Sequence, residues 1–278
     1  MARPVVDRSV GVSFSPLTLR ILSAVALGIP TVAAIAWGRP ALEVWLAVFV
    51  VLMAREWHML CGGRDWTGSR LALAASAVLV LGLSVFDAYG AALAVIVVAI
   101  PVVYMLARRE TGLRWGWTAS GVPYIGLTAL ALSWLRAVPD VGLLNLLWVF
   151  AVVWATDTTA YAAGRTLGGP KLAPPISPNK TWSGAVGGLI GAGIVGAVLG
   201  EVAGTGPATP AVAGMALSIV AQAGDLAESA VKRRFGVKDS GSIIPGHGGL
   251  FDRVDALLAA APAAALALSV VGADRLWQ

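Results

Sequence analysis

Charged residues are scarce in this chain. They make up 13% of its 278 residues, whereas hydrophobic residues make up 58% and the mean hydropathy is +0.80. A soluble globular domain carries about 25% charged residues, so this composition excludes that class and indicates a helical membrane protein. The formal net charge of +5 requires no nucleic acid, because basic loops beside the anionic headgroups of membrane lipids explain it.

Other common features are missing as well. Cys61 is the only cysteine, which excludes an intramolecular disulfide. Arg3 and Arg8 precede no short apolar core with a small-residue cleavage site, so we expect no removable signal peptide. The chain contains no GxxxxGK[ST] run, which excludes a P-loop, and it has no clear internal repeat.

Long apolar segments dominate what is present. A spanning helix needs about 20 mainly apolar residues, and nine segments qualify. They are residues 19–37, 41–60, 71–86, 89–107, 121–138, 142–163, 183–203, 208–230 and 250–272. We therefore predict an all-α polytopic membrane bundle of about nine transmembrane helices.

Basic residues predict the orientation of this bundle. With the N-terminus inside, seventeen of the twenty Lys and Arg residues lie on the inner side, and only Arg39, Arg136 and Arg275 lie outside. By the positive-inside rule, this bias predicts that the charged loops face the cytoplasm. We expect the protein to be integral to a bacterial-type plasma (inner) membrane.

The helices change character midway along the chain. Residues 1–118 form plain apolar spans with charges at their ends, as expected of a membrane scaffold, and we expect Arg55 and Glu56 to be interfacial. Residues 119–278 form the predicted catalytic region, because from about residue 142 onward polar groups enter the spans themselves.

Helical spacing groups these polar residues. Asp157, Tyr161 and Arg165 follow an i, i+4, i+8 spacing and share one face. A second shared face holds Asp225, Glu228, Ser229 and Lys232, and Asp252 and Asp255 begin the ninth span. Acids facing lipid are untenable at this depth, so we predict an internal polar cavity open to the cytoplasm.

Two loops lie on the predicted inner side. Residues 164–184 supply Arg165, Lys171, Lys180, Ser177 and Thr181, and prolines stiffen this loop. Residues 245–249 read PGHGG, a turn whose glycines let a phosphate approach the backbone beside the start of a helix. His247 in this turn can bind phosphate, cap the turn or transfer a proton, and the first two roles are favoured.

Small residues four apart mark the seventh span: Gly184 with Gly188, Gly187 with Gly191, and Gly196 with Gly200. Such spacing permits close helix packing. The packing is either within one chain or between two chains of a homodimer, and packing within the chain is the preferred interpretation.

The run from Ser229 to Asp255, called here the signature run, strongly resembles the signature of phosphatidate cytidylyltransferases. The matching residues are Ser229, Lys232, Arg233, Lys238, Asp239, Gly241, Pro245, His247, Gly248, Gly249, Asp252, Arg253 and Asp255. The SPNKTW segment at 177–182 and the segments around Asp157 and Asp225 are also similar to this family. The resemblance covers about residues 120–275. It departs at Ser183, where many relatives carry an acid or an amide.

The resemblance implies that CTP and phosphatidate react to give CDP-diacylglycerol and pyrophosphate. Both substrates are anions, so a divalent cation with fixed basic groups addresses the main barrier. The expected Mg²⁺ ligands are Asp225 and Asp252 first and Asp255 third, and the family is associated with K⁺ as a second cation. Lys180, Lys232 and His247 complete the expected catalytic set. Expected substrate-binding residues are Asp157, Ser177, Thr181, Ser229, Arg233, Lys238, Asp239, Gly248, Gly249 and Arg253.

Three other functions compete with this one. A CTP-dependent lipid kinase would use the same nucleotide but would transfer another phosphorus. A cation-coupled transporter also uses intramembrane acids, but it places them near the midplane between repeated halves. A CDP-alcohol phosphotransferase is disfavoured because its spaced DG…AR…G…D…D pattern is absent from the sequence.

Overall fold

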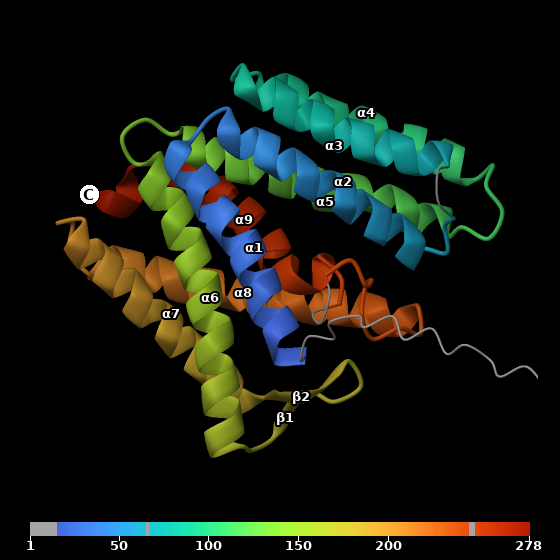
Figure 1. Ribbon diagram of the computed structural model, residues 1–278. Coiled ribbons are helices and arrows are strands. Elements are labelled where there is room, and N and C mark those ends of the chain that lie inside the picture. Colours follow the sequence, from blue (N-terminus) through green and yellow to red (C-terminus); the bar gives the residue numbers. More distant parts are fainter. Residues whose placement is uncertain (1–15, 65–66, 245–247) are drawn as a thin grey trace, which may run out of the picture.

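The computed structural model describes residues 16–64, 67–244 and 248–278, with side chains described from residue 25 onward. Within these ranges the chain forms nine α-helices, one short hairpin and a terminal 3₁₀ turn (Figure 1). The helices are α1 (Pro16–Trp37), α2 (Ala41–Leu60), α3 (Gly68–Val85), α4 (Tyr89–Ala107), α5 (Trp115–Ala137), α6 (Gly142–Leu167), α7 (Trp182–Val202), α8 (Ala208–Arg234) and α9 (Phe251–Val271). The 3₁₀ turn is Arg275–Trp277.

Seven of the described helices, α3 to α9, are long and apolar enough to cross a membrane. The helix α2 is as long, but it carries Glu43, Arg55 and Glu56. In α1, the apolar stretch with described side chains is Val25–Trp37. The nine helices occupy the nine predicted segments, which confirms the prediction of an all-α polytopic membrane bundle.

The loop before α7 is more ordered than predicted. Strand β1 (Lys171–Ala173) pairs antiparallel with β2 (Ser177–Thr181), and two prolines, Pro174 and Pro175, lie in the turn. The Thr181 side chain accepts a hydrogen bond from the Gly184 backbone N–H at 3.1 Å, so it caps the start of α7. The cap fixes the hairpin to the end of a membrane helix.

The glycines of α7 allow this helix to pack closely against α6 and α8 of the same chain. A Cβ atom at Gly184 would lie 2.9 Å from the Ala160 carbonyl oxygen of α6, and one at Gly188 would lie 3.1 Å from that of Thr156. At the other end of α7, a Cβ at Gly196 would lie 2.2 Å from the Pro210 carbonyl oxygen of α8. This close approach confirms the preferred interpretation, packing inside one chain.

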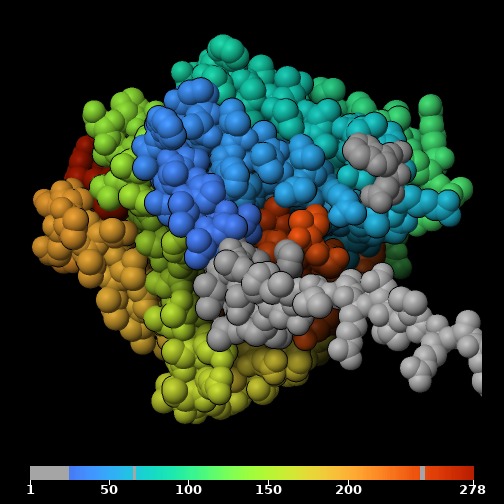
Figure 2. Space-filling model, viewed as in Figure 1, coloured from blue at the N-terminus to red at the C-terminus, as the bar shows by residue number. Residues whose placement is uncertain are grey.

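The helix α9 joins two hydrophobic cores. Leu250, Phe251 and Leu258 belong to a cluster built mainly from α2, α3, α4 and α5, whereas Ala256 and Leu257 belong to one that includes α6. Phe251 is flanked by the rings of Trp57 and Tyr124, with centroids 5.5 Å and 5.8 Å away. In Figure 2, orange-red atoms from around α9 reach the surface beside the blue atoms of α1 and α2. The start of α9 is therefore held by helices from both halves of the sequence.

Candidate active site

The hairpin and the end of α8 meet through charged side chains. Lys180 on β2 forms an ion pair with Asp225 on α8. Arg233, near the end of α8, donates a hydrogen bond from Nε to the Ile176 carbonyl oxygen at 3.3 Å. The predicted loop of residues 164–184 thus contacts α8 at two points, which the sequence had only placed on the same side of the membrane.

A polar pocket lies between α6, α8 and the hairpin. The predicted face of α6 lines it with Asp157, Tyr161 and Arg165, and Lys180 and Asp225 line the opposite side. Arg165 donates a hydrogen bond to the Tyr161 hydroxyl at 2.6 Å. The prediction that the three α6 residues share one face of a polar cavity is confirmed.

A second charged group surrounds Asp252 at the start of α9. Its Oδ1 lies 2.7 Å from Lys232 Nζ, and Lys232 Nζ lies equally far from Glu228 Oε2. Asp252 also accepts hydrogen bonds from the backbone N–H groups of Ser240 and Gly249, both at 2.9 Å. Asp252 therefore links the start of α9 to Lys232 of α8 and to Ser240 in the segment between the two helices.

The side chains predicted to share one face of α8 point in two different directions. Asp225 faces the polar pocket and pairs with Lys180, whereas Glu228 lines a groove between α5, α8 and α9. Three residues along a helix correspond to a rotation of about 300°, so these two side chains diverge by about 60°. Lys232, one turn after Glu228, follows it toward Asp252.

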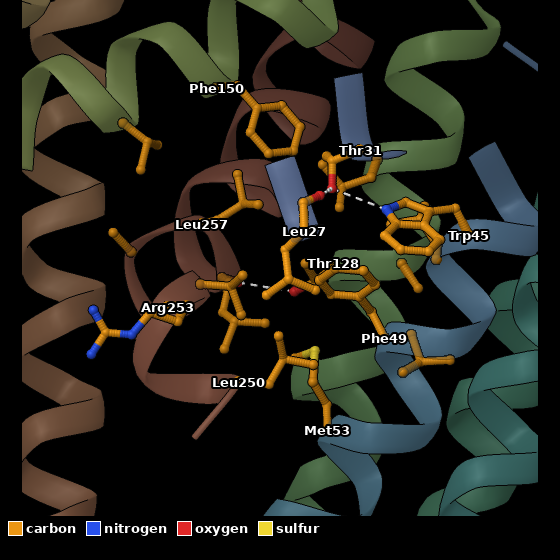
Figure 3. Close-up of a pocket in the computed structure, with 18 of the residues that line it drawn as sticks. Leu27, Thr31, Trp45, Phe49, Met53, Thr128, Phe150, Leu250, Arg253 and Leu257 are labelled. Atoms are coloured by element: carbon orange, nitrogen blue, oxygen red, sulfur yellow. Dashed lines mark hydrogen bonds between the residues drawn. The ribbon is translucent and has the colours of Figure 1, made fainter. Parts of the chain in front are cut away.

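An apolar cavity lies on the other side of Asp157. Its wall is made of aliphatic and aromatic side chains from α1, α2, α5, α6 and α9, with Asp157, Arg253 and Asp255 among the lining residues. Figure 3 shows Trp45, Phe49, Met53 and Phe150 lining it, with Arg253 at one edge. Asp157 lines both this cavity and the polar pocket. The polar pocket and the apolar cavity therefore meet at the Asp157 carboxylate.

The remaining predicted residues differ in exposure. Ser177 and Ser229 are partly buried, whereas Arg233, Lys238, Asp239 and Arg253 are exposed. Gly248 has φ +86°, a conformation that favours glycine, and Gly249 is buried beside Ser240. His247 lies outside the described residues. Ser183 donates a hydrogen bond to the Gly168 carbonyl oxygen, so it holds the start of the hairpin.

The predicted metal ligands do not form a ready three-residue set. Over residues 16–64, 67–244 and 248–278, no three His, Cys, Asp or Glu side chains lie close enough to hold a metal ion. Asp225 is paired with Lys180, and Asp252 with Lys232. Mg²⁺ commonly binds through one or two carboxylates, water and substrate phosphates. The oxygen donors present fit that mode of binding, with Asp225 facing the pocket.

Glu56, which the sequence suggested to be interfacial, is buried inside the protein. Its side chain is only 2% exposed, and its carboxylate accepts hydrogen bonds from the backbone N–H groups of Leu250 and Phe251, both at 2.9 Å. An acid near the end of an apolar run was the available signal, since a buried carboxylate requires partners. Its partners lie almost two hundred residues away, which the sequence pattern does not reveal.

The fold and the site together define a class. This is a helical membrane protein that gathers acidic and basic side chains between a polar pocket and an apolar cavity, an arrangement suited to a reaction between a polar anion and a lipid.

Comparison with known proteins gives the family. The profile of the cytidylyltransferase family matches residues 18–271, and the chain belongs to this family. The phosphatidate cytidylyltransferase of Brucella abortus biovar 1 (strain 9-941) is 43% identical over 249 residues, 89% of this chain and 91% of that protein. The proteins of the same name from Rickettsia bellii and Haemophilus influenzae are 31% identical over 256 residues and 44% identical over 151 residues. They align with 89% and 51% of this chain, and the alignments cover 89% and 51% of those proteins, respectively.

Proposed function

We propose that this protein is a phosphatidate cytidylyltransferase, which converts CTP and phosphatidate into CDP-diacylglycerol and pyrophosphate. An oxygen of the lipid phosphate attacks the α-phosphorus of CTP, and the bond from that phosphorus to the oxygen bridging to the β-phosphorus breaks. The leaving group is pyrophosphate, and no protein nucleophile is required. The observation that carries the proposal is the position of Asp157, between a polar pocket and an apolar cavity.

Each space suits one substrate. The apolar cavity offers aromatic and aliphatic walls for acyl chains, and Arg253 at its edge offers a cation to the lipid phosphate. The polar pocket offers Arg165 and Lys180, with the Asn179 and Gln222 amides, to a triphosphate nucleotide. A lipid phosphate at the edge of the first space would then lie next to a nucleotide phosphate in the second.

Fixed charges address the main difficulty, which is to bring two anions together. Lys180 and Lys232 are each held by carboxylates, Lys180 by Asp225 and Lys232 by Glu228 and Asp252. Basic groups held in place before substrate arrives need little reorganisation as charge moves in the transition state. Lys180 and Lys232 therefore have the catalytic roles in this proposal.

One or two of the three predicted ligands, Asp225, Asp252 and Asp255, would hold Mg²⁺ together with water and oxygens of the nucleotide. The ion would supply positive charge to the phosphate oxygens as pyrophosphate leaves. Asp252 already accepts hydrogen bonds from Lys232 and from two backbone N–H groups, so Asp225 and Asp255 have more room for a cation. K⁺ as a second cation is a further part of the proposal.

The orientation is proposed from the distribution of Lys and Arg. The site would face the cytoplasm of a bacterial-type plasma membrane, where CTP is available, and phosphatidate would come from the same bilayer. A homodimer is a separate prediction, and the mass of the detergent-solubilised particle tests it.

The decisive experiment follows products of the purified, detergent-solubilised protein with CTP, phosphatidate and Mg²⁺. We expect pyrophosphate and CDP-diacylglycerol in equal amounts. Release of CDP with transfer of a phosphoryl group would instead identify a CTP-dependent lipid kinase. If neither product forms, ion-dependent uptake into vesicles that contain the protein would identify the transporter alternative.

A further inference from the structure

The start of α9 lacks a capping side chain of its own. The residue at its N-cap is Leu250, which has no side-chain acceptor, yet the first N–H groups of any helix need partners. Glu56 of α2 supplies acceptors for two of them, because its carboxylate accepts hydrogen bonds from Leu250 and Phe251 N–H at 2.9 Å each. Just before the helix, Asp252 accepts a hydrogen bond from Gly249 N–H at 2.9 Å.

Ser240 of the signature run lies between the same two carboxylates. Its backbone N–H donates to Asp252 Oδ2 at 2.9 Å, and its hydroxyl donates to Glu56 Oε2 at 3.4 Å. Glu56 and Asp252 thus both bind Ser240 and both bind backbone N–H groups at the start of α9. A displacement of Glu56 would shift Ser240 and the start of α9, and with them the anchor points of Asp252.

Two glycines of the signature run leave space for Glu56. A Cβ atom at Gly241 would lie 2.7 Å from Glu56 Oε1, and one at Gly249 would lie 2.9 Å from Glu56 Oε2. Neither glycine has a positive φ, so close approach, rather than backbone conformation, requires glycine at these positions. The signature run is therefore shaped around a side chain that lies outside it.

We infer that Glu56 is a positioning residue for the reaction: its carboxylate holds the first turn of α9 and Ser240, and so sets the position of Asp252. The inference rests on the proposed function. It extends the site to α2, in the part of the chain that the sequence indicated as a plain scaffold. A negative charge at the start of a helix also interacts favourably with the helix dipole.

The test compares Glu56→Gln with Glu43→Gln in the purified full-length protein. Glu43 is also a buried acid of α2, and it lies about 20 Å from Glu56 along the helix axis. It accepts hydrogen bonds from Ser133 and Arg39. A glutamine at 56 keeps the size of the side chain but replaces one acceptor oxygen with an NH₂ group. We expect kcat to fall about 10- to 100-fold, the range typical of residues that orient functional groups. KM for CTP should stay within about threefold, and Glu43→Gln should keep the kcat of the original protein.

Melting temperatures in detergent separate positioning from stability. Equal losses of kcat and of stability in the two variants would overturn the inference, as would a folded Glu56→Gln protein with unchanged kcat. If Glu56→Gln does not fold, Gly241→Ala decides, because its Cβ must displace the same carboxylate. A folded Gly241→Ala protein with unchanged kcat overturns the inference, and one with reduced kcat supports it. If the unsubstituted protein releases no pyrophosphate, the proposed function has failed, which is a different result.

Discussion

Lys180 and Asp225 form an ion pair that joins the hairpin to α8. The two residues come from separate loop and helix segments, and the sequence predicts a catalytic role for Lys180 and Mg²⁺ binding for Asp225. In the structure each charge holds the other in place at the wall of the polar pocket. In the proposed reaction, this pair would position Lys180 for the substrate and Asp225 for a cation.

The first prediction concerns the basic residues. We expect Lys180→Ala and Lys232→Ala each to lower kcat more than Arg234→Ala does. Removing either lysine leaves a carboxylate without its ion-pair partner, whereas Arg234 is exposed at the last residue of α8. A contact of Arg234 with lipid headgroups is worth about 1 kcal/mol. Steady-state kinetics with both substrates varied measures the difference, and an equal loss in Arg234→Ala would contradict it.

The second prediction concerns the cation. Asp225→Asn and Asp252→Asn should each reduce turnover by orders of magnitude while the protein remains folded. Loss of a charged ligand removes several kcal/mol of transition-state stabilisation, and each 1.4 kcal/mol is about tenfold. Turnover against Mg²⁺ concentration and melting temperature are the measurements. Near-normal activity in either variant would remove that residue from the proposed metal site.

Helix positions and faces were predictable from the sequence, since both depend on local patterns. Apolar runs located all nine helices, and spacing placed Asp157, Tyr161 and Arg165 on one side of α6. The same reasoning wrongly placed Asp225 and Glu228 in one direction on α8, because a step of three residues leaves an angle of about 60° between their side chains.

Partners far apart in the chain were not predictable. Periodicity tells which face of a helix is polar but not which other helix it meets, so the contact of Glu56 with Leu250 and Phe251 was missed. The hairpin was missed for a different reason. Its strands are three and five residues long, and its proline-rich composition resembles that of a loop.

The third prediction concerns the apolar cavity. Gly28 lines this cavity, and a Cβ atom added to it would have no other atom within 4 Å, so Gly28→Phe would place a ring inside the cavity. If acyl chains occupy the cavity, we expect KM for long-chain phosphatidate to rise roughly tenfold, since overpacking costs about 1–3 kcal/mol. KM for CTP should not change. Gly82→Phe is the control, because Gly82 of α3 has equal space but lies outside the residues that line the cavity. A similar effect of both substitutions would argue against acyl-chain binding there.

The last prediction concerns orientation in the membrane. Cysteines introduced at Arg109 and Lys238, both exposed, should react in intact cells with a membrane-permeant reagent but not with an impermeant one. The reason is the seventeen-to-three distribution of Lys and Arg, which predicts that both positions lie in the cytoplasm. Cys61 is buried and is replaced first, so that it contributes no background. Glu201→Cys, at the opposite end of α7, is the matched control and should react with both reagents. Impermeant labelling at 238 with none at 201 would reverse the orientation, and a CTP site on the cytoplasmic face would then be untenable.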